Sequence, residues 1–306
     1  MIRIGSRGSQ LALWQANHIA DALRRAGHEV SIEIIRTTGD AVSNVAFNKV
    51  GTKGMFTKEI EEALYGGRID LAVHSLKDLP TEISPAFAIA AIAKREDPRD
   101  AFVSLKYGSF AALPSGARIG TSSLRRQAQL RAQRRDVDLV EFRGNVDTRL
   151  RKLEDGQVDA IVVATAGLER LGRTEWVRER FSPLVVCPAP GQGALAMETR
   201  SDDARIRAAI AFLDDEETHF AVTVERTALG ALGGGCHVPI GIYCRNTPEG
   251  IVVSGAVAHP DGSSLVRVEL RHESGQAAEQ LGHLTAERLL EQGAREILAP
   301  ASEQTG

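Results

Sequence analysis

Two stretches far apart in the sequence open in the same way, and this internal repeat constrains the fold more than any other feature. The stretch RIGSRGSQLALWQ starts at Arg3, and RIGTSSLRRQAQL starts at Arg118. Each reads as a short strand, a glycine, hydroxyl residues with arginine, and then a helix. In the first copy, apolar residues at Ala12, Ala16 and Ile19 follow the helical period. The repeat predicts two similar lobes that each begin with a strand-to-helix turn.

A second pair of similar stretches follows the first pair. EEALYGGRIDLAVHS from Glu61 parallels RKLEDGQVDAIVVAT from Arg151, each with a helix end, a glycine and then an apolar strand. Both apolar runs are short and contain β-branched residues, which is typical of parallel strands buried on both faces. The pattern therefore predicts two α/β lobes with mixed, mainly parallel sheets.

The two strand-to-helix turns are candidate anion sites. Ser9 in the first copy and Ser122 or Ser123 in the second are placed to cap the helix N-termini. Unpaired backbone N–H groups point out of such a turn, and the helix dipole adds a partial positive charge. Each lobe is therefore expected to bind an anionic group at its first turn.

Two segments rich in proline, glycine or charge divide the chain. AKREDPRDAF (93–102) and CPAPGQGALAM (187–197) are the expected crossings between the lobes, and the first is a good hinge. Beyond about residue 215, short strands alternate with turns, and helices are expected over 218–229 and 276–297. This pattern predicts a small third α+β domain with an antiparallel sheet. The expected domains are residues 1–93 with 193–212, residues 99–188, and residues 216–306.

Charge is segregated along the sequence. Between residues 118 and 152, ten lysines and arginines face four acidic residues, a net charge of +6 in a chain whose formal net charge is -3. Local basicity in an acidic protein favours a confined anionic ligand over a long polyanion such as a nucleic acid. A solvated helix face is the alternative explanation for part of this set, namely Arg131, Arg134 and Arg135.

Composition and cysteine usage restrict the class of protein further. The 306 residues suffice for two or three domains, and no apolar run approaches the ~18 residues of a membrane span. The N-terminus lacks the apolar core of a secretory signal, so export is not expected. Three cysteines without a CxxC pair fit a reducing compartment and offer no metal site. We therefore expect a cytoplasmic protein with no membrane or nucleic-acid partner and no bound metal.

Three stretches combine residues that can do chemistry. Lys77 and Asp78 follow a buried strand at the carboxyl end, where α/β sites form, although a surface pair or a helix cap would look the same. In NKVGTKGMFTKE, Lys49 and Lys53 lie among glycines, as in a basic lid or in an ordinary solvated loop. GGGCHVPIG sets Cys236 between three glycines and a proline, either as an attachment point or as a small buried residue.

Nine motifs, taken in order, resemble the porphobilinogen deaminase family, whose members are also called hydroxymethylbilane synthases. They are SRGSQLALWQ, KVGTKGMFTKE, AVHSLKDLP, REDPRDAFVS, GTSSLRRQAQL, FRGNVDTRL, GLERLG, APGQGA and GGGCHVPIG. The resemblance implies two hinged lobes arranged as in periplasmic binding proteins, a small third domain, and action as a monomer. It also implies a transferase that joins porphobilinogen units head to tail, releases ammonia at each step, and yields the linear tetrapyrrole hydroxymethylbilane for porphyrin and haem synthesis.

The resemblance also assigns roles to the candidate residues. A dipyrromethane cofactor would be attached to Cys236 by a thioether and would remain there through many turnovers. Six residues would hold it: Lys77, Thr121, Ser123, Arg125, Arg126 and Arg149. Six others would bind the incoming porphobilinogen or the growing chain: Arg7, Ser9, Lys49, Lys53, Arg143 and Arg170. Asp78 would be catalytic, because expulsion of ammonia needs a group that transfers a proton and stabilises a cation.

Other interpretations stay open on the residues alone. A hinged pair of lobes with anion-binding turns is also typical of a binding protein for an organic acid, which would carry no covalent group. A cysteine hydrolase that uses Cys236 and His237 is a further alternative, although nucleophile–base pairs are brought together by the fold and seldom by adjacency. Arg143, which precedes Gly-Asn, is also explained as a brace for a turn.

Overall fold

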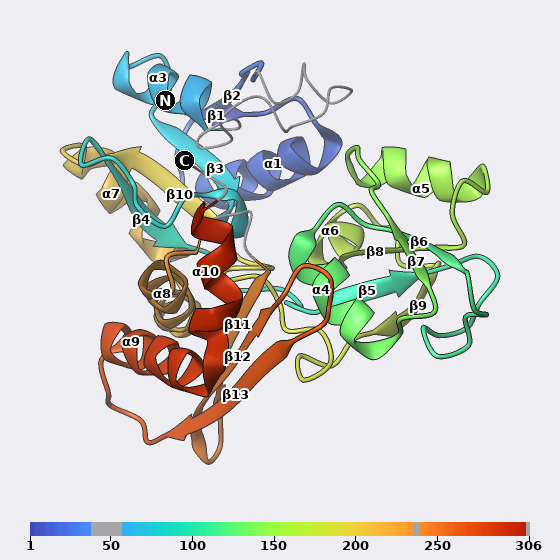
Figure 1. The fold of residues 1–306 in the computed structure, drawn as a ribbon. Coiled ribbons are helices and arrows are strands. Elements are labelled where there is room, and N and C mark those ends of the chain that lie inside the picture. The colour runs from blue at the N-terminus through green and yellow to red at the C-terminus, as the bar shows by residue number, and fades with distance from the viewer. Residues whose placement is uncertain (38–56, 235–238, 304–306) are drawn as a thin grey trace. The chain divides into compact units, whose positions relative to one another are not determined.

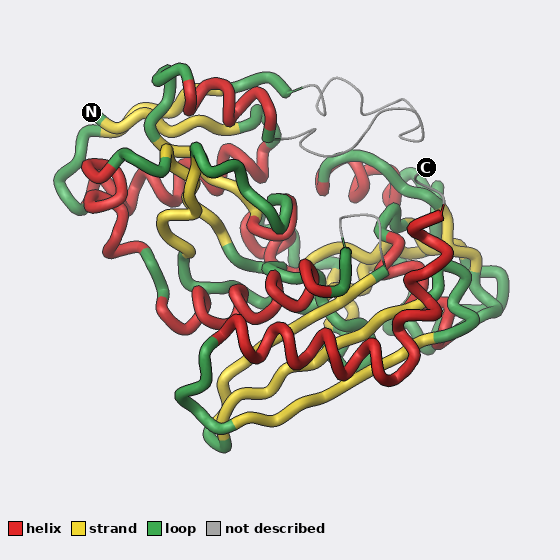
Figure 2. Tube along the Cα trace, turned by 60° about the vertical axis from the view of Figure 1, so that its left-hand side comes forward, coloured by secondary structure: helices red, strands yellow, loops and turns green. Residues whose placement is uncertain are grey.

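The computed structural model describes residues 1–37, 57–234 and 239–303 of the chain, which divides into two compact units. Unit 1 comprises Met1–Glu96, Arg170–Gly172 and Gly193–His219, and unit 2 comprises Asp97–Glu169, Arg173–Gln192 and Phe220–Gly306. The course of the chain can be followed in Figure 1 and the distribution of helices and strands in Figure 2. Over the described ranges, no helix is both long and apolar enough to cross a membrane.

A mixed sheet forms the centre of unit 1. Its strands lie in the order β2-β1-β3-β10-β4; β1 pairs in parallel with β2 and β3, whereas β10 runs antiparallel to both of its neighbours. The strands are β1 Ile2–Ser6, β2 Val30–Ile34, β3 Leu71–Ser75, β4 Phe87–Ile92 and β10 Leu195–Arg200. The helices are α1 Gln10–Arg25, α3 Lys58–Tyr65, η2 Leu76–Asp78, α7 Ala204–Ile210 and η3 Ala211–Leu213.

Strand β3 is buried on both faces, as its apolar run predicts. Leu71 and Val73 belong to a core that includes Ile19 of α1, while Ala72 belongs to a second core that includes Ile60 of α3. Successive side chains of a strand point to opposite faces, so helices must cover both sides of the sheet at this point. The polar residues that follow β3 are therefore displayed at its carboxyl end and not along its length.

Unit 2 contains a second sheet with the same arrangement of strands. The order is β7-β6-β8-β5-β9; β6 pairs in parallel with β7 and β8, whereas β5 runs antiparallel to β8 and β9. The strands are β5 Asp100–Val103, β6 Arg118–Gly120, β7 Asp138–Val140, β8 Ala160–Ala164 and β9 Val177–Arg180. The helices are α4 Leu124–Gln133, α5 Val146–Glu154 and α6 Thr165–Arg170.

The sequence repeat corresponds to equivalent elements of the two sheets. β1 with α1 and β6 with α4 hold the same topological positions, and so do β3 and β8. All strands of each sheet point the same way except one, β10 or β5, which confirms the expected mixed, mainly parallel sheets. The chain leaves unit 1 after Glu96, and the first strand that it then forms in unit 2 is the reversed strand β5. It returns to unit 1 at Gly193, and the first strand that it forms there is the reversed strand β10. These passages, at Glu96–Asp97 and Gln192–Gly193, lie inside the two segments expected to be crossings.

An antiparallel three-stranded sheet, β11-β12-β13, completes unit 2. The elements are α8 Glu216–Ala231, β11 Ile240–Thr247, β12 Gly250–Ala258, β13 Leu265–His272, α9 Ala278–Leu289, a π-helical turn Leu290–Ala294 and α10 Arg295–Glu303. The helix expected over 276–297 is interrupted at Gly293, whose φ of 102° lies in the left-handed region that glycine adopts readily. The α/β fold class with a small antiparallel sheet is thereby confirmed, while the division into three domains stays a prediction.

Candidate functional site

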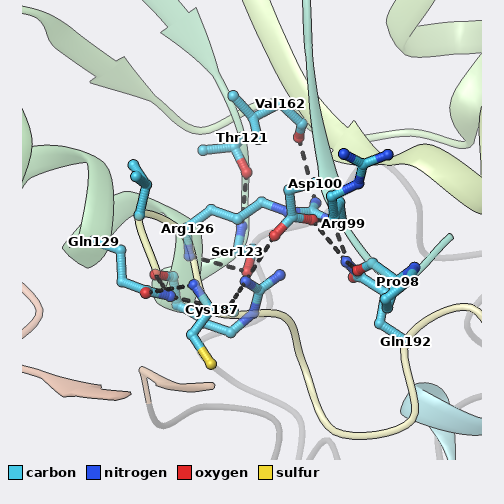
Figure 3. Close-up of polar contacts among 12 residues, drawn as sticks. Pro98, Arg99, Asp100, Thr121, Ser123, Arg126, Gln129, Val162, Cys187 and Gln192 are labelled. Carbon is cyan, nitrogen blue, oxygen red and sulfur yellow. Dashed lines mark hydrogen bonds and ion pairs between the residues drawn. The ribbon is translucent and has the colours of Figure 1, made fainter. Parts of the chain in front are cut away.

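Hydroxyl side chains hold the turn between β6 and α4, as the sequence predicts. Ser123 caps α4 by accepting a hydrogen bond from the backbone N–H of Arg126 at 3.4 Å. Thr121 is fully buried and its hydroxyl accepts from the backbone N–H of Ser123 at 3.3 Å. Ser122, the other candidate cap, instead accepts from the backbone N–H of Phe142 at 3.0 Å. Thr121 and Ser123 thus fix the start of α4, whose first turn carries the arginines of the site (Figure 3).

Arg125 and Arg126 share one buried carboxylate. Asp100, the first residue of β5, lies 2.7 Å from a guanidinium nitrogen of each arginine, and all three side chains are buried. Burial by itself would raise the pKa of Asp100, but the two guanidinium groups outweigh this effect and hold that pKa well below its usual range. The three residues together keep one net positive charge in the interior of unit 2.

Gln192 connects this cluster to the backbone. Its Nε2 donates to Oδ1 of Asp100 at 2.9 Å and to the carbonyl oxygen of Pro98 at 2.7 Å, and its Oε1 accepts from Arg126 at 3.4 Å. Sequence reasoning missed Asp100 and Gln192 as site residues, although both lie within quoted motifs. Asp100 could have been found from the sequence because a carboxylate at the start of the apolar run DAFV would be buried and would need a cationic partner.

Cys187 is a structural thiol in the same region. It is 1% exposed, and burial raises the pKa of its thiol to about 12. Its backbone N–H donates to Oε1 of Gln129 at 2.8 Å, while its carbonyl oxygen accepts from Arg125 at 2.6 Å. Arg267 of β13 donates to the same Gln129 oxygen at 3.1 Å. Within unit 2, this segment therefore ties the three-stranded sheet to α4 and to the arginine cluster.

Asp100→Asn is expected to destabilise the protein by about 3–5 kcal/mol at neutral pH, because two buried guanidinium groups lose their anion. Since the folded-state pKa of Asp100 is lowered, its stabilisation is present above the ordinary carboxylate pKa of about 4 and is lost as the pH falls below it. Chemical denaturation at pH 7 and at pH 3 measures the difference, which should shrink at the lower pH.

The matched control is Asp138→Asn, at an exposed carboxylate that begins β7. A change within about 0.5 kcal/mol is expected there. Equal losses in the two variants would contradict the view that the Asp100 ion cluster stabilises unit 2.

Arg149 is a cation with no carboxylate partner among the described residues. It lies on α5, and its Nε donates to the carbonyl oxygen of Gly144 at 2.8 Å. Burial, and secondly the positive charge of Arg126, lower the pKa of Arg149 to about 10. Arg143 differs, because its guanidinium forms an ion pair with Glu141. Of the predicted cations in unit 2, Arg149 has the environment that most favours an added anion.

Lys77 and Asp78 lie at the carboxyl end of β3 in unit 1. Leu76 is fully buried and anchors η2, so that the half-buried Lys77 and the exposed Asp78 follow the strand directly. Over the described ranges, no group forms a hydrogen bond or an ion pair with the Asp78 carboxylate. An exposed carboxylate at this edge of an α/β sheet is accessible to a ligand.

The first turn of unit 1 repeats the capping seen in unit 2. Ser9 caps α1 by accepting from the backbone N–H of Ala12 at 3.3 Å, and the half-buried Arg7 lies between β1 and this cap. Farther along α1, Nε2 of Gln15 donates to the hydroxyl of Ser75 at 2.8 Å. This bond fastens α1 to the last residue of β3, three positions before Asp78.

The remaining predicted residues fall into two groups. Arg170 is buried in unit 1 and forms an ion pair with Glu96 at 2.8 Å. Lys49, Lys53 and Cys236 lie outside the described residues. In unit 2 the structure thus brings together Thr121, Ser123, Arg125 and Arg126. The predicted residues that lie in unit 1 are Arg7, Ser9, Lys77, Asp78 and Arg170.

The fold is that of an α/β protein, and unit 2 holds two buried guanidinium groups beside a single buried carboxylate. Residues 2–208 match a family model described as "Porphobilinogen deaminase, dipyromethane cofactor binding domain", and residues 219–291 match "Porphobilinogen deaminase, C-terminal domain". The chain belongs to the porphobilinogen deaminase family. The predicted family, the transferase activity that makes hydroxymethylbilane from porphobilinogen, and the dipyrromethane cofactor are confirmed by these matches.

Three solved structures match part of the chain at low sequence identity. A nutrient binding protein from Burkholderia cenocepacia bound to methionine has a TM-score of 0.44 and 14% identity, over 71% of this chain and 93% of that one. An ABC transporter periplasmic substrate-binding protein from Coxiella burnetii has a TM-score of 0.42 and 16% identity, over 72% and 94%. The periplasmic VFT2 domain of BvgS from Bordetella pertussis has a TM-score of 0.41 and 11% identity, over 68% and 84%.

Proposed function

We propose that this chain assembles hydroxymethylbilane with Asp78 as its catalytic residue and with the arginines of unit 2 holding a cofactor linked to Cys236. The observation that carries the proposal is the family match along residues 2–208 and 219–291. Two structural facts support the assignment of roles. Asp78 is exposed without a partner among the described residues, and the ionic cluster of unit 2 has more positive than negative charges.

The cations of unit 2 fit a polyacidic cofactor. Arg125 and Arg126 share the single charge of Asp100, and Arg149 has no carboxylate partner among the described residues, so these four residues carry a net charge of +2. Both rings of a dipyrromethane bear carboxylates, and charge-assisted hydrogen bonds to guanidinium groups contribute roughly 1.5–3 kcal/mol each. When bound, the cofactor supplies the pyrrole carbon at which the chain grows. Its binding set would be completed by Lys77, Thr121 and Ser123.

A second set of residues is assigned to the substrate and the growing chain, namely Arg7, Ser9, Lys49, Lys53, Arg143 and Arg170. Arg143 would exchange its ion pair with Glu141 for a substrate carboxylate. This exchange costs little, because ion pairs near the surface contribute about 0–1 kcal/mol. Each porphobilinogen carries an acetate and a propionate, so paired cations would fix its orientation as well as its charge.

Asp78 is proposed to transfer a proton to or from the aminomethyl nitrogen of the substrate as ammonia leaves. A carboxylate can take up or release a proton at that nitrogen, and its negative charge stabilises the cation that develops on the substrate. The neighbouring Lys77 and the arginines orient carboxylates instead. An arginine in particular does not release its proton in the working pH range.

A monomer in the cytoplasm without a nucleic-acid partner is the proposed state of the protein. Over the described ranges, the buried Cys187 and Cys244 form no disulfide, which supports a reducing compartment. The formal net charge of -3 is unfavourable for binding a long polyanion.

Arg149→Met, made in a Cys236→Ala background that cannot carry the cofactor, is expected to raise the melting temperature at pH 7 by about 1–2 °C. The lowered pKa of Arg149 means that the folded state disfavours its charge. That charge therefore destabilises the cofactor-free protein at neutral pH, and the penalty begins to fall only as the pH rises through about 10, toward the ordinary pKa of arginine. In the chain with Cys236 intact, the same substitution should lower the fraction of molecules that carry the cofactor, as measured by intact mass.

Arg151→Met supplies the matched control, since Arg151 is exposed on the same helix. It should change neither quantity. A lower melting temperature for Arg149→Met in the cofactor-free background would contradict the proposal that the charge of Arg149 destabilises the protein until an anion binds.

The experiment that tests the function is incubation of the purified protein with porphobilinogen. Release of ammonia together with a linear tetrapyrrole is the expected result. Binding of porphobilinogen without ammonia release would favour the binding-protein alternative, and hydrolysis of unrelated esters or amides at Cys236 would favour the cysteine hydrolase.

A further inference from the structure

Trp14 occupies a position on α1 that the packing of the core does not explain. The core-facing side of this helix is marked by Ala16, Ile19 and Leu23, which are 0–1% exposed. Trp14 is only half-buried, and it belongs to none of the apolar clusters found over the described ranges. A large aromatic side chain outside the core calls for another role.

The indole of Trp14 contacts two polar side chains instead. The guanidinium carbon of Arg170 lies 5.8 Å from the centroid of the indole, within the range of a cation–π interaction. The ring of His18, one helical turn along α1, is stacked on the indole with centroids 5.1 Å apart and planes 9° from parallel. The indole of Trp14 thus has one cationic and one aromatic neighbour.

Arg170 is held by two further contacts within unit 1. Its Nε lies 2.8 Å from Oε2 of Glu96, and its Nη2 donates to the carbonyl oxygen of Gly193 at 2.7 Å. The side chain is 4% exposed. The ion pair with Glu96, the hydrogen bond to Gly193 and the contact with the indole of Trp14 together restrict the position of the Arg170 guanidinium.

We propose that Trp14 is a positioning residue, which holds the Arg170 guanidinium in place so that it meets a porphobilinogen carboxylate in a productive orientation. The inference rests on the proposed substrate-binding role of Arg170. Bidentate recognition of a carboxylate depends on the orientation of the guanidinium plane. Loss of the indole should therefore weaken substrate binding more than it slows the chemical step.

Trp14→Leu is expected to raise the KM for porphobilinogen about 3- to 10-fold while kcat stays within about 2-fold, because the cation–π contact is lost. Trp14→Phe keeps an aromatic face and should recover most of the loss. The matched control is Trp176→Leu, which removes the other tryptophan of the chain from the core of unit 2. That control should lower the melting temperature without a selective rise in KM.

A double-mutant cycle with Arg170→Gln tests whether Trp14 acts through Arg170. The KM effects of Trp14→Leu and Arg170→Gln should be clearly less than additive. A readout independent of turnover is the fluorescence of Trp14, which is the only tryptophan left in Trp176→Phe. Arg170→Gln in that background should shift its emission.

Several outcomes would overturn the inference. They are an unchanged KM in Trp14→Leu, additive effects in the cycle, an unchanged emission, or a joint loss of kcat and stability like that of a core substitution. Failure of the wild type to convert porphobilinogen would instead overturn the proposed function. The emission measurement would then still decide whether Trp14 and Arg170 interact.

Discussion

Cys236→Ala is expected to give a folded protein with the mass of the unmodified chain and no turnover of porphobilinogen. The family match implies a covalent dipyrromethane, and a thioether needs an accessible sulfur. The other two cysteines cannot substitute, because Cys187 is 1% exposed and Cys244 is 2% exposed. The high pKa of the Cys187 thiol, about 12, also keeps it in the unreactive protonated form. Intact mass of freshly purified protein and a porphobilinogen assay measure the two expected losses.

Cys244→Ala is the matched control for this experiment, since it removes a sulfur from β11, eight positions farther along the sequence. It should keep the added mass, and any loss of activity should follow from lower stability alone. The attachment site would be wrong if the added mass persisted in Cys236→Ala or disappeared in Cys244→Ala. Circular dichroism of both variants separates a missing cofactor from a missing fold.

Asp78→Asn is expected to lower kcat by about 100- to 10,000-fold, the usual contribution of a proton-transferring side chain. The amide has the shape of the carboxylate, but it neither accepts the proton nor stabilises a developing cation. Since no described residue bonds to the Asp78 carboxylate, the free energy of unfolding should change by less than about 0.5 kcal/mol. The added mass of the cofactor should be retained, so the measurement is turnover per cofactor-bearing chain.

Glu82→Gln is the control for Asp78→Asn, because Glu82 is another exposed carboxylate a few residues along the same chain segment. Near-normal turnover is expected in the control. Near-normal turnover in Asp78→Asn itself would contradict its catalytic assignment and would move attention to the neighbouring Lys77.

Local sequence patterns predicted the elements that depend on local rules. The Ser9 and Ser123 caps follow from a hydroxyl placed ahead of an amphipathic run, and β3 and β8 follow from short apolar stretches after a glycine. The repeat then predicted that these elements hold equivalent positions in two sheets. Lys77 and Asp78 could be proposed for a site because the end of a buried strand is a defined place in an α/β fold.

The partners of the arginines could not be predicted in this way. Asp100 meets Arg125 and Arg126 because β5 lies antiparallel to β8, a long-range pairing on which local periodicity carries no information. The contact of Trp14 with Arg170 likewise joins residues distant in sequence. Charge counting found the basic segment of residues 118–152 but not the carboxylate that neutralises part of it. The sequence therefore indicated where cations gather, and only the structure distinguishes paired cations from Arg149.

The reversed strand of each sheet has a consequence for the order in which the nascent chain can fold. All strands of the unit 2 sheet lie within residues 100–180, so that sheet can close soon after β9 leaves the ribosome. The unit 1 sheet needs β10, Leu195–Arg200, which inserts between β3 and β4. Until that segment is synthesised, β3 and β4 expose open edges prone to mispairing. The unit 1 sheet is thus begun before the five-stranded sheet of unit 2 and completed after it.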